Sequence, residues 1–289
     1  MIVYRSMDRQ TLDAAYNNSA AVAESDRYLA DWLHRSEALR NRMPDHLNLI
    51  YGDAPCTRLD FFATNRSGAA TLLFFHGGYW QRNTKEGFSF AAEGPLAHGF
   101  HVAVAGYTLA PEATMDGIVR EARTALRWLH EHLATLGGDP TRLYISGWSA
   151  GGHLTAMLMD EPLVAGGLAV SGLFDLEPIR LCYLNEKLSL DAEEGAPQQP
   201  LAESAGTHGQ AHRRLWGGRA TGAETPITRI RGGAERARPS GGDHRSGRLP
   251  SLCRSGTAGT AGRPFGKDAS RRGDGLGPSS CGGELRKAG

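Results

Sequence analysis

The feature that most constrains this chain is a serine turn between a predicted strand and a predicted helix. Gly147-Trp148-Ser149-Ala150-Gly151 follows the apolar run Leu143–Ser146 and precedes Gly152–Met157, a stretch that can form a helix. A tight turn at such a junction strains the backbone of the serine, and a Cβ at either flanking glycine would collide with the neighbouring strand or helix. Ser149 is therefore the candidate nucleophile. The alternative is a glycine-rich turn without a catalytic role.

Apolar runs alternate with helical patterns along the first two thirds of the chain. Thr71–Phe75 and Val102–Ala105 are continuously apolar, which is typical of strands buried on both faces of a parallel sheet. Further strands are expected at Leu47–Tyr51, Arg58–Thr64 and Gly167–Ser171, and helices at Met7–Leu39 and Met115–Leu136. This alternation predicts an α/β fold, a mostly parallel sheet flanked by helices.

A second glycine-rich loop, His76-Gly77-Gly78-Tyr79-Trp80, directly follows the buried strand Thr71–Phe75. In a serine hydrolase of such architecture, this loop supplies a backbone N–H that faces the serine, and the residue after the nucleophile, here Ala150, supplies another. Each donor typically contributes about 3–4 kcal/mol to stabilisation of the transition state. The alternative is an ordinary turn with a packed histidine. The mechanism of a serine hydrolase requires both the serine turn and a glycine-rich loop of this kind. The presence of both therefore favours the catalytic interpretation.

These two loops, together with Tyr107-Thr108-Leu109-Ala110-Pro111-Glu112, resemble the α/β-hydrolase superfamily over residues 10–190. They are most similar to the arylformamidase (kynurenine formamidase) branch, with esterases of the hormone-sensitive-lipase type as close relatives. Those esterases usually carry a third glycine where this chain has Tyr79. The Tyr79-Trp80 pair and the lead-in Leu12–Asn18 therefore favour the formamidase-like group.

The resemblance implies a role for each matching residue. Ser149 is the nucleophile, Gly78, Tyr79 and Ala150 are the oxyanion donors, and His76 and Gly77 belong to the oxyanion loop, which His76 orients. Trp80 and Trp148 are expected to line an aromatic substrate pocket. The reaction implied is cleavage of an N-formyl amide of an aromatic amine, or of a small ester, through an acyl-enzyme.

A serine nucleophile requires a histidine base and a carboxylate, which in this fold follow the serine in the order acid, then histidine. The histidines after Ser149 are His153, His208, His212 and His244.

None of these histidines has the expected placement. His153 lies one turn along the helix of the nucleophile, so packing is its expected role, and His208 and His212 precede any late strand. Asp243 and His244 are adjacent in sequence, although an acid and a base normally lie on separate loops. Asp175 is an alternative acid, but a turn or capping role is favoured. We leave acid and base unassigned and expect weak activity or none.

The last third of the chain differs in character from the rest. Residues 1–194 carry a net charge of −8, whereas residues 195–289 carry +9, with 21 Gly, 14 Arg and no Val, Tyr or Met. Such a segment buries too little apolar surface to fold by itself, so we expect a disordered tail. We interpret the change as a shift of the coding frame near residue 195. A natural disordered tail and a basic arm that binds nucleic acid remain open alternatives.

Other features exclude several classes of protein. The N-terminus lacks a basic region followed by an apolar core, and no stretch approaches the roughly 18 apolar residues of a membrane span. Cys56, Cys182, Cys253 and Cys281 are scattered, which predicts neither a zinc site nor a disulfide framework. We expect a soluble, cytoplasmic protein with a small-molecule substrate and without a cofactor, metal, nucleic-acid or membrane partner.

Overall fold

A computed structural model describes residues 1–191 of the chain. The predicted C-terminal tail, with the candidates His208, His212, Asp243 and His244, lies outside these residues.

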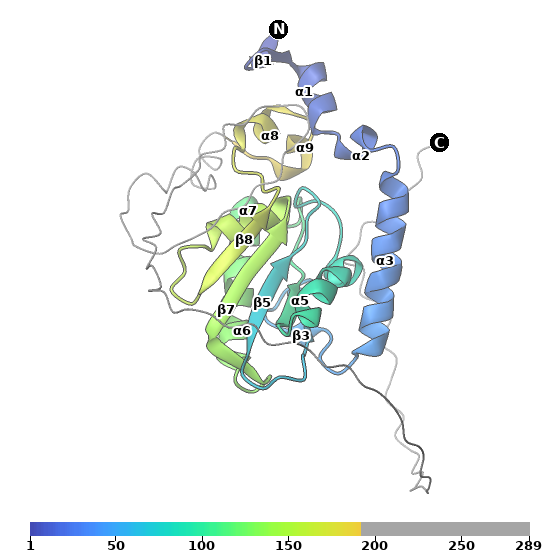
Figure 1. The fold of residues 1–289 in the computed structure, drawn as a ribbon. Coiled ribbons are helices and arrows are strands. Elements are labelled where there is room, and N and C mark those ends of the chain that lie inside the picture. The colour runs from blue at the N-terminus through green and yellow to red at the C-terminus, as the bar shows by residue number, and fades with distance from the viewer. Residues whose placement is uncertain (192–289) are drawn as a thin grey trace, which may run out of the picture. The chain divides into compact units, whose positions relative to one another are not determined.

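A six-stranded sheet forms the centre of the described fold, with the strand order β3-β4-β6-β5-β7-β8 (Figure 1). Its strands are β3 (Leu49–Ile50), β4 (Arg58–Phe62), β5 (Ala69–Phe75), β6 (His101–Ala105), β7 (Gly138–Trp148) and β8 (Gly166–Val170). The strands β6, β5, β7 and β8 run parallel, whereas β4 is antiparallel to β6 and β3 to β4. The predicted α/β fold with a mostly parallel sheet is confirmed.

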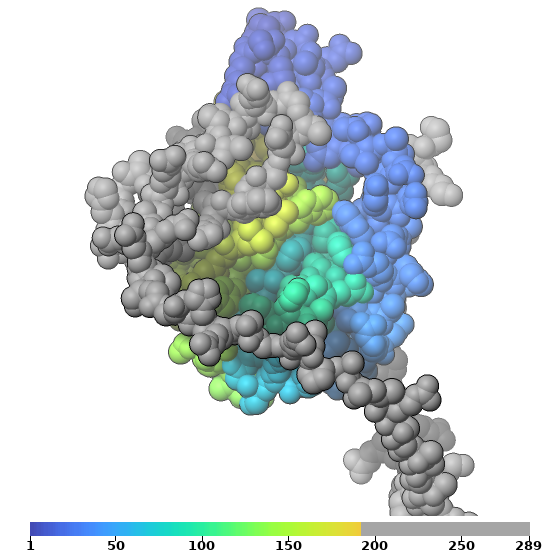
Figure 2. Space-filling view, viewed as in Figure 1, coloured from blue at the N-terminus to red at the C-terminus, as the bar shows by residue number. Residues whose placement is uncertain are grey.

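Helices cover both faces of this sheet. Side chains alternate along each strand, so the apolar strands present apolar residues to both faces. Leu73 and Phe75 of β5 join the core cluster that contains Leu126 of α6 (Met115–His132), whereas Phe74 joins the cluster that contains Leu39 of α3 (Ser25–Arg42). The helices are α1 (Arg9–Tyr16), α2 (Asn18–Ala21), α3 (Ser25–Arg42), α4 (Lys85–Phe88), the 3₁₀ helix η1 (Ser89–Ala92), α5 (Glu93–Ala97), α6 (Met115–His132), α7 (Ala150–Met157), α8 (Glu177–Leu181) and α9 (Asn185–Leu188). The surface of α3, in blue, adjoins that of the α4–α5 segment (Figure 2).

The helical stretch predicted over Met7–Leu39 is present as three helices and not as a continuous one. The chain forms a small hairpin, β1 (Ile2–Tyr4) and β2 (Met7–Asp8), before α1, and α1, α2 and α3 are separate helices. The Asp8 side chain accepts the Thr11 N–H and begins α1, and the Asn17 side chain accepts the Ala20 N–H and begins α2. Both side chains satisfy the backbone at helix starts, and the cap at Asn17 lies inside the predicted helical stretch, where it begins a new helix.

Among the described helices, none combines the length and the apolar character that a membrane span requires.

Candidate functional site

Ser149 lies at the junction of β7 and α7 in a strained backbone conformation, with φ 57° and ψ −115°. The glycines on either side permit this turn. A Cβ on Gly147 would overlap the backbone of Gly151, and a Cβ on Gly151 would overlap the carbonyl of Phe75. The structure thus shows the steric need for both glycines that the sequence indicated.

Backbone hydrogen bonds hold this turn against its neighbours. The Ser149 N–H donates to the Val170 carbonyl of β8 at 2.8 Å, and the Ser149 carbonyl accepts from the His153 N–H at 3.1 Å. The Ser149 residue itself is half-buried, and Ala150 behind it is fully buried. The serine therefore presents a partly accessible side chain on a fixed backbone.

The loop after β5 approaches this serine closely. A Cβ on Gly77 would stand 3.2 Å from the Ser149 Cβ and only 2.8 Å from the Trp148 carbonyl oxygen, so a side chain here would push the two loops apart. Gly78 has φ +126°, a conformation that side chains rarely adopt, and its Cβ would overlap the Arg82 carbonyl. The two glycines let the loop fold tightly beside the serine.

Two side chains fix the peptide between Gly77 and Gly78. The Gly77 carbonyl accepts hydrogen bonds from His76 Nδ1 at 2.9 Å and from Asn83 Nδ2 at 3.0 Å. In a trans peptide the carbonyl and the following N–H point in opposite directions, so these bonds set the direction of the Gly78 N–H. Asn83 was not predicted from the sequence, because its role depends on a turn in which it takes φ 74°.

His76 is buried and serves as a donor to the backbone. Its ring stacks on Tyr107 with centroids 4.3 Å apart, and the Tyr107 hydroxyl donates to the His76 carbonyl at 2.8 Å. Burial lowers the pKa of His76 to about 4, so the ring is neutral near pH 7. These contacts explain why the Tyr107 motif accompanies the glycine loop.

Tyr79 and Trp80 continue the loop with positive φ values of 52° and 58°. The Tyr79 hydroxyl donates to the Tyr16 carbonyl at 3.0 Å, which ties the loop to α1. Trp80 is fully buried, and its ring meets that of His153 edge-on at 5.0 Å. Trp80 and His153 thus have the contacts of core residues, and a pocket-lining role for Trp80 stays a prediction.

Trp148 lies on the α3 side of the sheet. Its ring stacks on Phe88 at 5.8 Å and meets Trp32 edge-on at 5.4 Å. Trp148 and Trp80 therefore belong to different core clusters. The structure does not bring the two predicted pocket tryptophans together.

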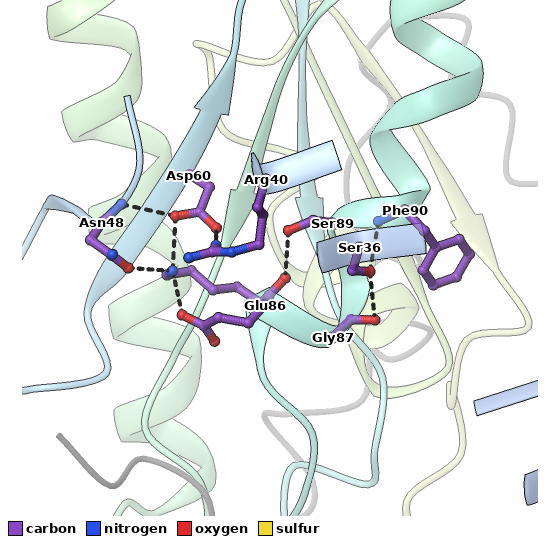
Figure 3. Close-up of polar contacts among 9 residues, drawn as sticks. Ser36, Arg40, Asn48, Asp60, Glu86, Gly87, Ser89 and Phe90 are labelled. Atoms are coloured by element: carbon purple, nitrogen blue, oxygen red, sulfur yellow. Dashed lines mark hydrogen bonds and ion pairs between the residues drawn. The ribbon is translucent and has the colours of Figure 1, made fainter. Parts of the chain in front are cut away.

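A buried group of charged side chains anchors the segment that follows the His76–Trp80 loop (Figure 3). Asp60 of β4 is fully buried and lies 2.8 Å from the ammonium of Lys85, which begins α4, and it also pairs with Arg40 of α3. Lys85 further donates to Asn48 Oδ1 at 2.6 Å and to Glu86 at 2.5 Å. Since Lys85 follows Asn83 by two residues, this group fixes the position of the loop against the sheet.

Ser36 of α3 binds the same segment at a second position. The Ser36 hydroxyl donates to the Gly87 carbonyl and accepts from the Phe90 N–H, both at 3.0 Å (Figure 3). The segment after the His76–Trp80 loop is thus held by Arg40 and Ser36 of α3.

Asp175, the alternative acid, follows β8 and is engaged elsewhere. One carboxylate oxygen accepts the Glu177 N–H at 3.1 Å near the start of α8, and the other accepts the Tyr4 hydroxyl at 2.6 Å. Burial and this bond raise the pKa of Tyr4 to about 12. The favoured turn role of Asp175 agrees with these contacts. Among residues 1–191, no group of His, Cys, Asp and Glu side chains is arranged to hold a metal ion.

Comparisons with known proteins agree with the fold and with the resemblance. Residues 59–161 match the family BD-FAE. The kynurenine formamidase of Danio rerio is 30% identical, with 68% of this chain and 71% of the relative covered, and that of Salmo salar is 33% identical, with 57% and 58% covered. A carboxylesterase of Mycobacterium tuberculosis is 31% identical over 35% of this chain and 32% of its own length. These relatives place the chain among hydrolases of the esterase and formamidase type.

A solved structure supports the same placement. A putative thioesterase from Silicibacter sp. TM1040 has a TM-score of 0.61 and 29% identity, and the match covers 71% of this chain and 79% of the other.

Proposed function

We propose that this chain, which belongs to the kynurenine formamidase family of α/β-hydrolases, cleaves the N-formyl amide of an aromatic amine with Ser149 as nucleophile. The observation that carries the proposal is the approach of Gly77 to Ser149, where a Cβ on the glycine would stand 3.2 Å from that of the serine. The held Gly77–Gly78 peptide lies beside a strained serine, the arrangement that acyl transfer requires.

In the proposed reaction, Ser149 Oγ attacks the formyl carbon and loses its proton. The negative oxygen of the tetrahedral intermediate accepts hydrogen bonds from backbone N–H groups of the oxyanion loop, Gly78 or Tyr79, and of Ala150. The C–N bond then breaks, the amine leaves with a proton, and water hydrolyses the formyl-serine ester to release formate. Each donor supplies about 3–4 kcal/mol of transition-state stabilisation.

The proton transfers require a base, and residues 1–191 contain no histidine whose observed contacts suit that role near Ser149. His76 donates to Gly77, and His153 packs on Trp80. General acid–base catalysis typically contributes about 10²–10⁴-fold to the rate, so a serine hydrolase without a base and an acid is slower by about that factor. We therefore expect weak turnover of the formamide.

The second candidate is an esterase, and the unassigned base favours it. An aryl ester expels a phenolate that does not need a proton, whereas an aromatic amine must be protonated as it leaves. A site with a serine and oxyanion donors but no base therefore hydrolyses activated esters better than formamides.

The test is turnover of N-formylkynurenine and of p-nitrophenyl acetate by the full chain, with Ser149→Ala as the variant and Ser19→Ala, at an exposed serine, as the matched control. We expect slow hydrolysis of both substrates that Ser149→Ala abolishes and Ser19→Ala leaves unchanged. A fluorophosphonate probe separates the noncatalytic alternative, because a scaffold would stay unlabelled at Ser149. Hydrolysis that persists in Ser149→Ala would refute the nucleophile.

A further inference from the structure

Arg82 is an exposed cation on the oxyanion loop. Its guanidinium carbon lies 5.9 Å from the centre of the Tyr79 ring, a cation–π arrangement. The loop is fixed at this point because the Gln81 side chain donates to the Leu184 carbonyl at 2.7 Å. The Arg82 backbone also lies directly against Gly78, where it would overlap a Cβ. Arg82 and the predicted oxyanion donors thus belong to one turn.

The positive charge of Arg82 is not neutralised by an acidic side chain of residues 1–191, since none lies within ion-pair distance. Asp13 and Arg82 both act electrostatically on Tyr183, so Asp13 is the acid to consider as a partner. Asp13 is already bound to other groups. It pairs with Arg9 at 3.0 Å and accepts the Tyr183 N–H at 2.8 Å. Within residues 1–191, no acidic side chain therefore competes with an anion for Arg82.

Tyrosine side chains lie near this cation. Arg82 lies over the Tyr79 ring, and its charge also acts on Tyr183, from the segment between α8 and α9. Burial raises the pKa of both phenols, so they remain uncharged and do not compete for the guanidinium. A cation beside uncharged aromatic rings is suited to a planar aromatic ligand that carries a carboxylate.

We propose that Arg82 is a specificity-determining residue that binds a carboxylate on the aromatic part of the substrate, while the oxyanion loop holds the acyl oxygen. This inference rests on the proposed function for the location of the acyl group. It narrows the substrate class to anionic aryl formamides or esters.

The test is a binding measurement, so it does not depend on turnover. The Ser149→Ala chain is titrated by calorimetry with 2-formamidobenzoate and with 2-formamidobenzamide, which has nearly the same shape without the charge. We expect the anion to bind about five- to twentyfold more tightly, as for one charge-assisted contact at a partly exposed site. The preference should decrease as salt is raised.

Three variants, each added to Ser149→Ala, identify the residue. Arg82→Gln is expected to remove the preference, Arg82→Lys to keep part of it, and Arg42→Gln, at an exposed arginine of α3, to leave it unchanged. Equal affinity for the two ligands, no binding of either, or a preference that survives Arg82→Gln would overturn the inference. The proposed function is judged separately by labelling and hydrolysis with Ser149 intact, so each can fail without the other.

Discussion

Asn83 Nδ2 donates a hydrogen bond to the Gly77 carbonyl over 3.0 Å, and this contact holds the peptide that carries the Gly78 N–H. His76 donates to the same oxygen from the opposite end of the loop sequence, at 2.9 Å. The direction of a predicted oxyanion donor thus depends on side chains that do not themselves touch the reacting atoms.

The first prediction concerns Asn83 as a positioning residue. Asn83→Gly removes the amide but tolerates φ 74°, so the backbone is not strained by the change. We expect the kcat for p-nitrophenyl acetate to fall about tenfold or more with little change in KM, because a misdirected donor weakens the transition state selectively. Asn65→Gly, at an exposed position, is the control. An unchanged kcat, or a loss confined to KM, would contradict the role of Asn83.

The second prediction concerns the pH dependence of stability. The His76 pKa of about 4 lies below its ordinary 6.5, so the unfolded chain binds the proton more readily. The contribution of neutral His76 is therefore complete above pH 6.5 and decreases as the pH falls towards 4. Between pH 7 and pH 5 this amounts to about 2 kcal/mol of the free energy of unfolding.

Urea unfolding at the two pH values measures this difference, and His76→Asn removes the titrating group while retaining an amide donor. The variant should lose less stability than the parent between pH 7 and pH 5. An equal loss in both proteins would assign the pH dependence to other groups.

The third prediction concerns the buried charges at the end of the loop. Lys85→Met leaves the carboxylate of Asp60 buried with one cation fewer, and removal of one partner of a buried pair costs about 3–5 kcal/mol. Denaturant unfolding should show a loss of this size. Lys187→Met, at an exposed lysine, should change stability by less than about 0.5 kcal/mol. Similar small effects for both variants would show that Arg40 alone compensates Asp60.

The sequence predicted the central strands well because their signal is local. Thr71–Phe75 and Val102–Ala105 are continuously apolar, and they lie within β5 and β6, where helices cover both faces. Helix limits were predicted less well, since a single side chain decides them. Asp8 caps the first helix, and Asn17 caps a new helix inside a pattern that periodicity alone extends unbroken.

The candidate site likewise has features that the sequence predicts and contacts that it does not. Its glycines were predictable, because the collisions that they avoid follow from the turn itself. The partners of Asp60 and of the Gly77 carbonyl were not, because Lys85 and Asn83 acquire these contacts only when the loop folds back against the sheet. The roles of Ser149 and of the oxyanion donors stay predictions that the placement of the two loops supports.

The fourth prediction concerns the coding frame. Leu168 and Val170 of β8 are 42% and 36% exposed, and a cavity of about 670 Å³ with mainly apolar lining lies between α5 and β8. Further structure normally covers an exposed edge strand and apolar face of this kind. We propose that the coding frame before the shift encoded that structure.

Sequencing of the DNA around codon 195 tests this proposal. We expect an inserted or lost base, and an alternative frame downstream that contains Val, Tyr and a histidine near its end. The chain with the frame restored should hydrolyse the formamide about 10²–10⁴-fold faster, the usual contribution of general acid–base catalysis. A frame without any such change would refute the shift.

The last prediction concerns the approach of the two loops. Gly77→Ala would place a methyl group 2.8 Å from the Trp148 carbonyl and 3.2 Å from the Ser149 Cβ, so the loops must separate. Gly87→Ala is a matched control, because a Cβ there meets no atom within 4 Å. We expect Gly77→Ala to slow fluorophosphonate labelling of Ser149 by about tenfold or more, whereas Gly87→Ala labels like the parent. Circular dichroism should show both variants folded. Equal labelling rates in the two variants would mean that the close approach of Gly77 to Ser149 does not contribute to the reactivity of the serine.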